Sequence, residues 1–242
     1  MSDDLNGVRA LVVGGSGGIG AAVSVMLASQ GASLLVHGGH DRARLDATLA
    51  RCREVGCSAE GVIAPIAQAE DAEPVVEAAG DVDILVVAYG PWLELPVDET
   101  PVAEWRALTE ANLILPAYLL SRLLPGMRSR QYGRVVLFGG PRSDRAEGFQ
   151  RIGAYAAVKA GLASLVRSVA TQYAPDNVRC NMIAPGYVET EYLTDEQIER
   201  IRLARPTRRL VQPRQIAALC RALLDDSLDP VNGAIIPVDY GE

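Results

Sequence analysis

Short apolar runs alternate with longer amphipathic segments along the chain, and this alternation restricts its possible folds more than any other feature. Several of the runs are apolar at nearly every position, as strands buried on both faces of a parallel sheet are. A strand, a helix and a second strand in succession form the unit from which parallel sheets covered by helices are built. The sequence therefore predicts a single doubly wound α/β domain over residues 1–242, with about seven parallel strands.

The same alternation gives each element an expected range. Strands are expected at residues 8–13, 33–37, 59–64, 83–88, 134–138, 178–183 and 234–238. Helices are expected at residues 19–30, 41–55, 70–79, 100–124, 153–173 and 214–224. Asp41 is expected to cap the second helix, and Thr100 to cap the fourth, with Pro101 in its first turn.

Composition limits the classes of partner. The chain is 49% hydrophobic and 22% charged, which allows a sizeable core, and its net charge of −7 argues against nucleic acid or an anionic membrane as a partner. No apolar run approaches the ~20 residues that span a bilayer. The N-terminal stretch MSDDLNGVRA is acidic where a signal peptide is basic. The four cysteines and two histidines lack metal-ligand spacing. We therefore expect a cytoplasmic protein with neither a metal site nor a membrane partner.

A glycine-rich turn follows the first expected strand. Gly14, Gly18 and Gly20 lie between that strand and the next helix, in the sequence GGSGGIG. Small residues let the backbone approach a pyrophosphate, and the free amides of a helix N-terminus attract its charge. Glycines also serve ordinary tight turns, but the position between a strand and a helix near residue 14 favours dinucleotide binding.

Tyr155 and Lys159 stand four residues apart in a helical segment, so their side chains point toward the same space. A phenol has a pKa of about 10 in water, and a nearby ammonium group favours the phenolate and lowers that pKa. The pair is therefore a candidate for proton transfer near neutral pH. Because such pairs are common by chance, the assignment depends on the rest of the chain.

Four motifs together resemble those of the short-chain dehydrogenase/reductase family, and the resemblance covers nearly the whole chain. The family's TGxxxGxG motif aligns on residues 13–20, its YxxxK motif on Tyr155 and Lys159, its helix asparagine on Asn112, and its PG-x-x-x-T element on residues 185–190. The resemblance implies a Rossmann-type fold, a nicotinamide dinucleotide cofactor and hydride transfer to a carbonyl group.

The resemblance also implies roles for individual residues. In this family the tyrosine donates a proton, the lysine holds the nicotinamide ribose and lowers the tyrosine pKa, the asparagine helps to hold a relay water, and a serine orients the substrate carbonyl. The implied catalytic residues are Tyr155, Lys159, Asn112 and Ser143. The implied cofactor-binding residues are Gly14, Ser16, Gly18, Ile19, Gly20, His40, Tyr155, Lys159, Pro185, Gly186, Val188 and Thr190.

The surroundings of Asn112 give its role a second argument. Pro116 has no N–H and cannot bond the carbonyl of Asn112, so the helix is expected to bend there. The free carbonyl is a candidate for holding the relay water. A kink relieved by solvent is the alternative.

The chain departs from the family pattern at several positions. Alignment from the fifth strand places Gly140 where the family has its catalytic serine, and Ser143 follows three residues later in a longer loop. Ser143 is the candidate replacement, although a loop serine more often forms a turn. Val13 replaces the usual threonine, VAYG at residues 87–90 replaces NNAG, and VDYG at residues 238–241 replaces VDGG.

The end of the second strand bears on the choice of cofactor. Gly38 occupies the position of the acidic residue that holds the ribose of NAD, and the family's usual basic residue is also absent. His40, Arg42 and Arg44 follow and can supply positive charge, although they also suit a solvated first helical turn. Asp41 either caps the second helix or binds the ribose. The sequence favours NADP(H) over NAD(H).

Residues 187–213 align with the family's mobile substrate lid. Their arginines either meet an anionic substrate or carrier or form a solvated face: Arg200, Arg202, Arg205, Arg208 and Arg209. Trp92, Tyr89 and Phe149 are candidates to line an apolar pocket.

The function expected from the resemblance is reduction of a ketone by NAD(P)H. The overall pattern is most similar to 3-oxoacyl-carrier-protein reductases, and a sugar, steroid-like or polyketide ketone is the alternative substrate. A dinucleotide-binding regulatory or partner subunit with little catalysis is the competing class. A homotetramer, or a dimer, is expected through the helices that carry Asn112 and Tyr155, where the apolar run LILPAYLL lies.

Overall fold

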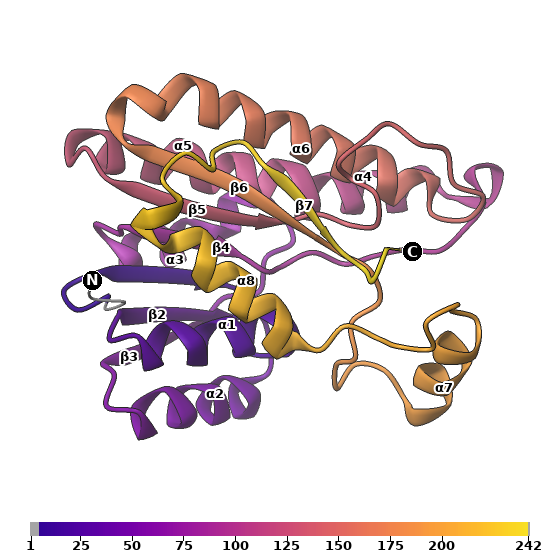
Figure 1. Ribbon diagram of the computed structural model, residues 1–242, viewed down its shortest axis with the longest axis horizontal. Helices are drawn as coiled ribbons and strands as arrows, with labels where there is room; N and C mark the ends of the chain where they lie inside the picture. The colour runs from indigo at the N-terminus through magenta and orange to yellow at the C-terminus, as the bar shows by residue number, and fades with distance from the viewer. Residues whose placement is uncertain (1–4, 242) are drawn as a thin grey trace.

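The computed structural model describes residues 5–241, which is the predicted domain without its first four residues and its last. Seven parallel strands form one sheet in the order β3-β2-β1-β4-β5-β6-β7 (Figure 1). The strands are β1 (Arg9–Val13), β2 (Ser33–Gly38), β3 (Ala59–Ile63), β4 (Ile84–Val87), β5 (Gly133–Phe138), β6 (Val178–Pro185) and β7 (Ile235–Val238). The doubly wound Rossmann-type fold is confirmed, and each strand lies within two residues of its expected range at either end.

Helices cover both faces of the sheet and create two cores. One face packs against α1 (Gly18–Ser29), α2 (Arg42–Glu54) and α8 (Pro213–Leu224). The other packs against α3 (Glu73–Ala79), α5 (Leu115–Ser129) and α6 (Gly153–Tyr173). Two shorter helices, α4 (Val102–Thr109) and α7 (Asp195–Leu203), lie at the edge where the strands end, and α7 projects from the body (Figure 1).

Single turns complete the architecture. They are the 3₁₀ segments Ala69–Ala72, Val97–Glu99, Ala174–Asp176 and Asp226–Leu228 and the π-helical segment Glu110–Ile114. In the part of the chain that the structure describes, no helix has the length and apolar character needed to cross a bilayer.

Of the two predicted helix caps, Asp41 is confirmed and Thr100 is wrong. The Asp41 carboxylate accepts the Arg44 N–H at 3.0 Å and caps α2 as expected. Thr100 does not cap the fourth helix, because its hydroxyl donates to the Pro96 carbonyl at 2.7 Å and Pro101 takes the cap position.

The helix expected at residues 100–124 is interrupted rather than continuous. It divides into α4, the π-helical segment Glu110–Ile114 and α5, which continues to Ser129. The Leu115 N–H donates to the Glu110 carbonyl, five residues back, where an α-helix would use four. The extra residue accommodates Pro116, which cannot continue the regular ladder, so the expected irregularity takes the form of a π-turn beside Asn112.

A buried histidine fastens the end of β1 to its neighbours. His37 on β2 is fully buried, its Nδ1 accepts the Gly14 N–H at 3.2 Å, and its Nε2 donates to the Ala64 carbonyl at 2.8 Å. Sequence patterns assigned this residue only a place on a strand. Burial lowers the pKa of the His37 imidazole, which therefore stays neutral and holds the glycine turn in place.

The linkage between His37 and stability gives the first prediction. An unfolded histidine takes up a proton near its ordinary pKa of about 6.5, whereas folded His37 resists protonation, so the free energy of unfolding falls as the pH drops below that value. We expect H37Q to lower the free energy of unfolding at pH 7 by about 1–2 kcal/mol and to flatten its decline from pH 7 to pH 5. Urea denaturation measures both effects. H40Q, which alters the exposed histidine, is the control, and an unchanged pH slope in H37Q would contradict the assignment.

Candidate active site

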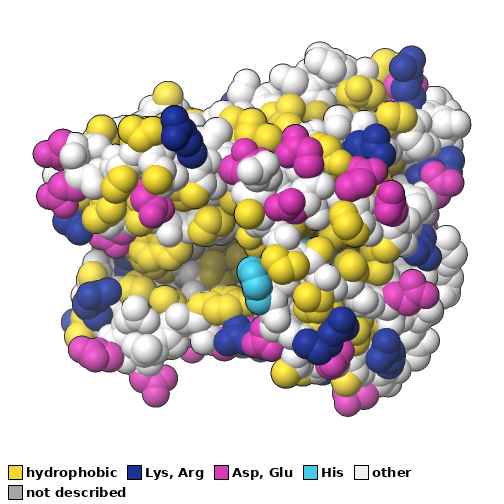
Figure 2. Space-filling view, turned by 180° about the vertical axis from the view of Figure 1, so that it is seen from behind, with side chains coloured by type: hydrophobic (Ala, Val, Ile, Leu, Met, Phe, Trp, Pro, Cys, Tyr) yellow, Lys and Arg dark blue, Asp and Glu magenta, His cyan; other side chains and the backbone are white. Residues whose placement is uncertain are grey.

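Loops that follow β1, β4, β5 and β6 meet beyond the carboxyl ends of the strands and enclose a cavity of about 380 Å³. In the view from behind, a hollow walled largely by hydrophobic side chains opens beside the projecting α7 lobe (Figure 2). The structure brings these expected site residues to its walls: Ile19, Tyr155, Lys159, Pro185, Gly186, Val188 and Thr190. Tyr89 and Trp92 also line it, whereas Phe149 lines the neighbouring hollow.

Tyr155 and Lys159 share one face of α6, as their spacing predicts. Lys159 is 4% exposed, and its Nζ donates to the Phe138 carbonyl at 2.6 Å, at the end of β5. The same Nζ lies 5.7 Å from the centroid of the Tyr155 ring. The Tyr155 hydroxyl faces the Gly139 carbonyl at 3.5 Å, the outer limit for a hydrogen bond. Both polar groups therefore lie against the carboxyl end of β5.

The pKa of Tyr155 is shifted in the direction opposite to the expected one. Burial raises the pKa of the Tyr155 phenol, and burial lowers the pKa of the Lys159 ammonium to about 7. The expected depression of the phenol pKa fails in this structure because desolvation disfavours both charged forms. The raised pKa keeps the phenol protonated at neutral pH but makes it a weaker acid than a free phenol, so proton donation requires that the phenolate be stabilised as it forms.

Asn112 lies directly behind the cavity wall. Its Nδ2 donates to the Pro91 carbonyl at 3.0 Å and to the Leu108 carbonyl at 3.1 Å, while its buried Oδ1 has no hydrogen-bond partner among the described residues. Gly90, with φ of 152°, passes so close that an added Cβ would lie 2.3 Å from that Oδ1. An unpaired buried acceptor beside the cavity fits a residue that holds a water.

Ser143 is a buried residue of the loop between β5 and α6. Its Oγ donates to the Gly140 carbonyl at 2.8 Å and accepts the Gly140 N–H at 2.9 Å, so the hydroxyl closes its own turn. A Cβ at Gly140 would lie 2.4 Å from Cε1 of Tyr155. Because position 140 has no side chain, the Tyr155 ring can lie close to the backbone there. The role of Ser143 in orienting a carbonyl stays a prediction.

The glycine turn requires its glycines for two close approaches. Gly14 has φ of 76°, and a Cβ there would lie 2.9 Å from the Ala88 backbone of the loop after β4. A Cβ at Gly20 would lie 2.1 Å from the Gly14 carbonyl oxygen. Gly17 takes the cap position of α1 and offers no side-chain cap, so the first amides of the helix point outward unblocked by a capping group.

An internal carboxylate already uses one of these amides. Glu191, which follows the expected cofactor residue Thr190, accepts the Gly18 N–H at 2.8 Å through its Oε1. Tyr192 lies against Gly17, where an added Cβ would be 2.1 Å from the tyrosine hydroxyl. The turn therefore binds an anion in this structure, which is the chemistry that a pyrophosphate requires. No sequence pattern pointed to Glu191 or Tyr192.

The expected nucleotide-ribose residues lie beside this turn. Arg44 lies 3.9 Å from the Glu191 carboxylate and 4.8 Å from the centroid of the Tyr192 ring. His40 is exposed just before α2. A Cβ at Gly38 would lie 3.2 Å from Cβ of Ser16, so Ser16 occupies part of the space that an acidic residue at position 38 would need.

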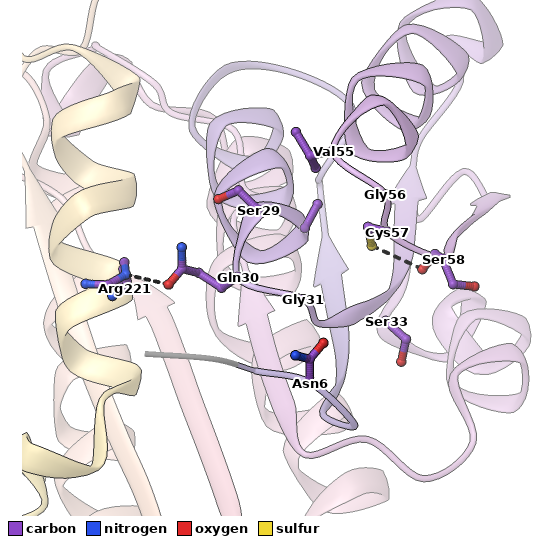
Figure 3. A pocket seen from close by; sticks show the side chains of 11 residues that line it. Asn6, Ser29, Gln30, Gly31, Ser33, Val55, Gly56, Cys57, Ser58 and Arg221 are labelled. Atoms are coloured by element: carbon purple, nitrogen blue, oxygen red, sulfur yellow. Dashed lines mark hydrogen bonds between the residues drawn. The ribbon is translucent and has the colours of Figure 1, made fainter. Parts of the chain in front are cut away.

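A larger hollow of about 670 Å³ lies at the opposite edge of the sheet, where the strands begin (Figure 3). Ser33 and Ser58 mark that edge, and Arg221 donates to the Gln30 side chain across it at 2.8 Å. None of the expected site residues lines this hollow. Among residues 5–241 no cluster of three or more histidine, cysteine, aspartate or glutamate side chains is arranged to hold a metal ion.

A parallel sheet with a glycine turn at the start of its first helix, and a Tyr/Lys pair over the neighbouring strand ends, defines a dinucleotide-dependent class of enzyme. Comparison with known proteins agrees. A family model described as "Enoyl-(Acyl carrier protein) reductase" matches residues 14–242. The chain is 30% identical to an acetoacetyl-CoA reductase of Allochromatium vinosum, covering 96% of this chain and 97% of the relative.

Two further relatives are named for other substrates. The chain is 28% identical to a 2-dehydro-3-deoxy-D-gluconate 5-dehydrogenase of Formosa agariphila, covering 98% of this chain and 93% of the relative. The crystal structure of a 3-oxoacyl (acyl-carrier-protein) reductase from Agrobacterium tumefaciens C58 with NADP bound superposes with a TM-score of 0.91 at 28% identity, covering 100% and 96% of the two chains. The protein belongs to the short-chain dehydrogenase/reductase family, and it is an oxidoreductase.

The Glu191 contact gives the second prediction. A dinucleotide must displace the Glu191 carboxylate from the Gly18 amide, and a charged acceptor holds an amide more tightly than a neutral one. We expect E191Q to lower the dissociation constant of NADPH by about tenfold, measured by nucleotide fluorescence. E189Q is the matched control, because Glu189 belongs to the same segment but pairs with Arg202 at 3.4 Å. Equal affinity in E191Q and the unaltered protein would refute competition for the amide.

Restoring the family's serine gives the third prediction. Because a Cβ at position 140 would meet the Tyr155 ring at 2.4 Å, we expect G140S to turn over more slowly than the unaltered protein, not faster. G140A carries the same Cβ without the hydroxyl and is expected to lose as much. Comparison of steady-state kcat separates the effect of the added Cβ from that of the hydroxyl. A G140S variant faster than both G140A and the unaltered protein would show that the hydroxyl outweighs the crowding.

Proposed function

We propose that this protein reduces a ketone to a secondary alcohol with a nicotinamide dinucleotide as hydride donor, and that Tyr155 is the acid. The observation that carries the proposal is the placement of Tyr155 and Lys159 on the wall of a cavity that Ile19 and Thr190 also line, beside the anion-binding glycine turn. The function of a protein in this family depends on such a site and not on the fold alone.

The residues present fit the cofactor. The first amides of α1 would hold the pyrophosphate once the Glu191 carboxylate, to which the Gly18 N–H now donates, is displaced. Lys159 and Thr190 line the cavity in which the nicotinamide end would lie, together with Pro185, Gly186 and Val188. When bound, the reduced nicotinamide supplies a hydride to the carbonyl carbon.

The proton comes from the protein. The Tyr155 hydroxyl donates its proton to the carbonyl oxygen, which becomes the alcohol, and a phenolate remains on Tyr155. Protonated Lys159 stabilises that phenolate by opposite charge, and with a pKa of about 7 it can pass a proton on to restore the phenol. Asn112, with its unpaired Oδ1 behind the wall, would hold the water through which the proton is replaced.

NADP(H) is the proposed cofactor. Gly38 leaves no acid to bind the ribose hydroxyls of NAD, and Arg44 lies within 3.9 Å of the carboxylate that occupies the glycine turn. Once that carboxylate leaves, Arg44 and the neighbouring Arg42 provide positive charge, and His40 a ring N–H, where the 2′-phosphate of NADP would lie. The NADP in the Agrobacterium relative supports the same choice.

The substrate proposed is a 3-oxoacyl thioester or a related ketone. Apolar and aromatic walls from Tyr89, Trp92, Ile152 and Leu193 suit a carbon chain. The name of the Allochromatium relative supports a 3-oxoacyl thioester, and the name of the Formosa relative supports a sugar-derived ketone. The contact between Glu191 and the Gly18 amide favours the competing class, a dinucleotide-binding partner subunit with little catalysis.

The expected homotetramer and cytoplasmic location stay predictions. Half of the apolar run LILPAYLL is buried within the chain, with Leu115, Leu119 and Leu120 in the core. Ile114, which is 42% exposed, is the part of the run that remains accessible to a partner copy.

Substitution of the acid tests the proposal. We expect Y155F to reduce ketone turnover by about 10²–10⁴-fold, the usual contribution of a proton donor, with NADPH affinity retained. The measurement is NADPH oxidation with a panel of acetoacetyl thioesters and cyclic ketones. Y173F, at the other end of the same helix, is the control. Y155F turnover equal to that of the unaltered protein would remove the assignment, and tight NADPH binding without turnover of any ketone would support the partner subunit.

A further inference from the structure

A second hollow, of about 320 Å³, adjoins the Tyr155 cavity and is called the arginine pocket here. The two hollows share the walls Pro141, Ile152, Gly186 and Tyr187. The charged residues that line the arginine pocket are Glu94, Arg142, Arg151, Arg205, Arg209 and Asp239. Four guanidinium groups against two carboxylates make this pocket cationic in a protein whose net charge is −7.

Two of the arginines are held on aromatic faces. The Arg205 guanidinium lies 4.4 Å from the centroid of the Tyr187 ring, and that of Arg209 lies 4.2 Å from the Tyr240 ring. Stacking on a ring fixes the plane of a guanidinium without using its N–H groups. Tyr187 lines both hollows and meets the Trp92 ring edge-on at 6.3 Å, so this wall connects the arginines with the Tyr155 cavity.

Residues with strained backbone conformations line or adjoin the arginine pocket. Tyr240 and Arg142 line the arginine pocket with φ of 61° and 55°, and Arg208, with φ of 52°, directly precedes Arg209. A side chain in this left-handed region is strained, and such residues cluster at functional sites. The other described non-glycine residues of this kind are Gln131 and Asn177, in turns before β5 and β6. Tyr240 stands where the family pattern has glycine. The residue whose backbone is strained is therefore also the one whose ring stacks on Arg209.

The arginines of the pocket differ in how far they are neutralised. Arg142 pairs with Glu147, and Arg151 pairs with Glu94 at 3.1 Å. Within residues 5–241, Arg209 stacks on Tyr240 and forms no ion pair. An exposed, stacked guanidinium with open N–H edges is the group that a carboxylate binds by paired hydrogen bonds.

We infer that the arginine pocket binds the carboxylate of the substrate, with Arg209 as its main partner, so that the substrate is a small oxo acid. The inference rests on the proposed ketone reduction. The two hollows adjoin and share four lining residues, so we expect a short molecule to place its ketone at Tyr155 and its carboxylate at Arg209. A carrier-bound thioester is disfavoured, because its phosphate lies at the far end of a long arm and not beside the ketone.

Pairs of oxo acids and their methyl esters test the inference. The probes are acetoacetate, 4-oxopentanoate and 5-oxohexanoate, each with its methyl ester, which differ in the separation between ketone and carboxylate. We expect the unaltered protein to prefer at least one acid over its ester. R209A should lose about 10- to 100-fold in kcat/KM on that acid, chiefly through KM, and little on the ester. R200A is the matched control, because Arg200 belongs to the same segment but lines neither hollow.

Two outcomes would overturn the inference. One is an equal loss on acid and ester in R209A, and the other is turnover of esters with no preference for any acid. R209K, which keeps the charge, should recover part of the activity on the acid and guards against a variant that fails to fold.

Calorimetric titration with the preferred acid separates this inference from the proposed function, because it needs no turnover. If no ketone in the panel is reduced with either nucleotide, the proposed function fails, and 4-oxopentanoate serves as the titrant. Binding that weakens in R209A then still supports the arginine pocket, whereas equal or absent binding in the two proteins refutes it.

Discussion

The close approach of the glycine turn to the strand beside it is the constraint on which the site depends. Gly14 lies against the Ala88 backbone and Gly20 against the Gly14 carbonyl, with distances that leave no room for a Cβ at either position. This packing lets α1 start immediately at the end of β1, with its first amides facing outward. His37 holds the turn from the side through the Gly14 N–H. Because all the strands are parallel, every other loop of the site reaches the same edge.

The protein carries a net negative charge, yet this edge is organised around anions. On one side the Gly18 amide binds the Glu191 carboxylate, with Arg44 nearby. On the other side, stacked arginines line a pocket that adjoins the Tyr155 cavity. The segment 187–213 contributes to both, through Glu191 and Arg209. One surface segment therefore links the proposed nucleotide site to the proposed carboxylate site, and both are matched to charged ligands.

Burial sets the protonation of the proposed catalytic pair, Tyr155 and Lys159. Desolvation keeps the Tyr155 phenol protonated and makes the Lys159 ammonium easier to deprotonate. Lys159 is also bound to the Phe138 carbonyl, which fixes its position relative to the ring. Tyr155 therefore begins with its proton, as the proposed reduction requires, and the phenolate that forms needs the positive charge of Lys159. The closed turn of Ser143 and the absence of a side chain at position 140 place the Tyr155 ring close to the backbone after β5.

The order of strands and helices, the glycine turn and the Tyr155/Lys159 pair followed from the sequence by itself, because hydrophobic periodicity and motif spacing are local properties. Asn112 and Pro116 likewise indicated an irregular helix, although not that it takes a π-turn. Only the tertiary structure decided the direction of the Tyr155 pKa shift, the bracing role of His37, the contact of Glu191 with Gly18 and the stacking of Arg205 and Arg209 in one pocket. Each of these depends on residues far apart in the chain, since desolvation, charge pairing and steric exclusion act between neighbours in space. The sequence determined the scaffold and its chemistry, and three-dimensional packing decided which groups are charged, covered or free to bind.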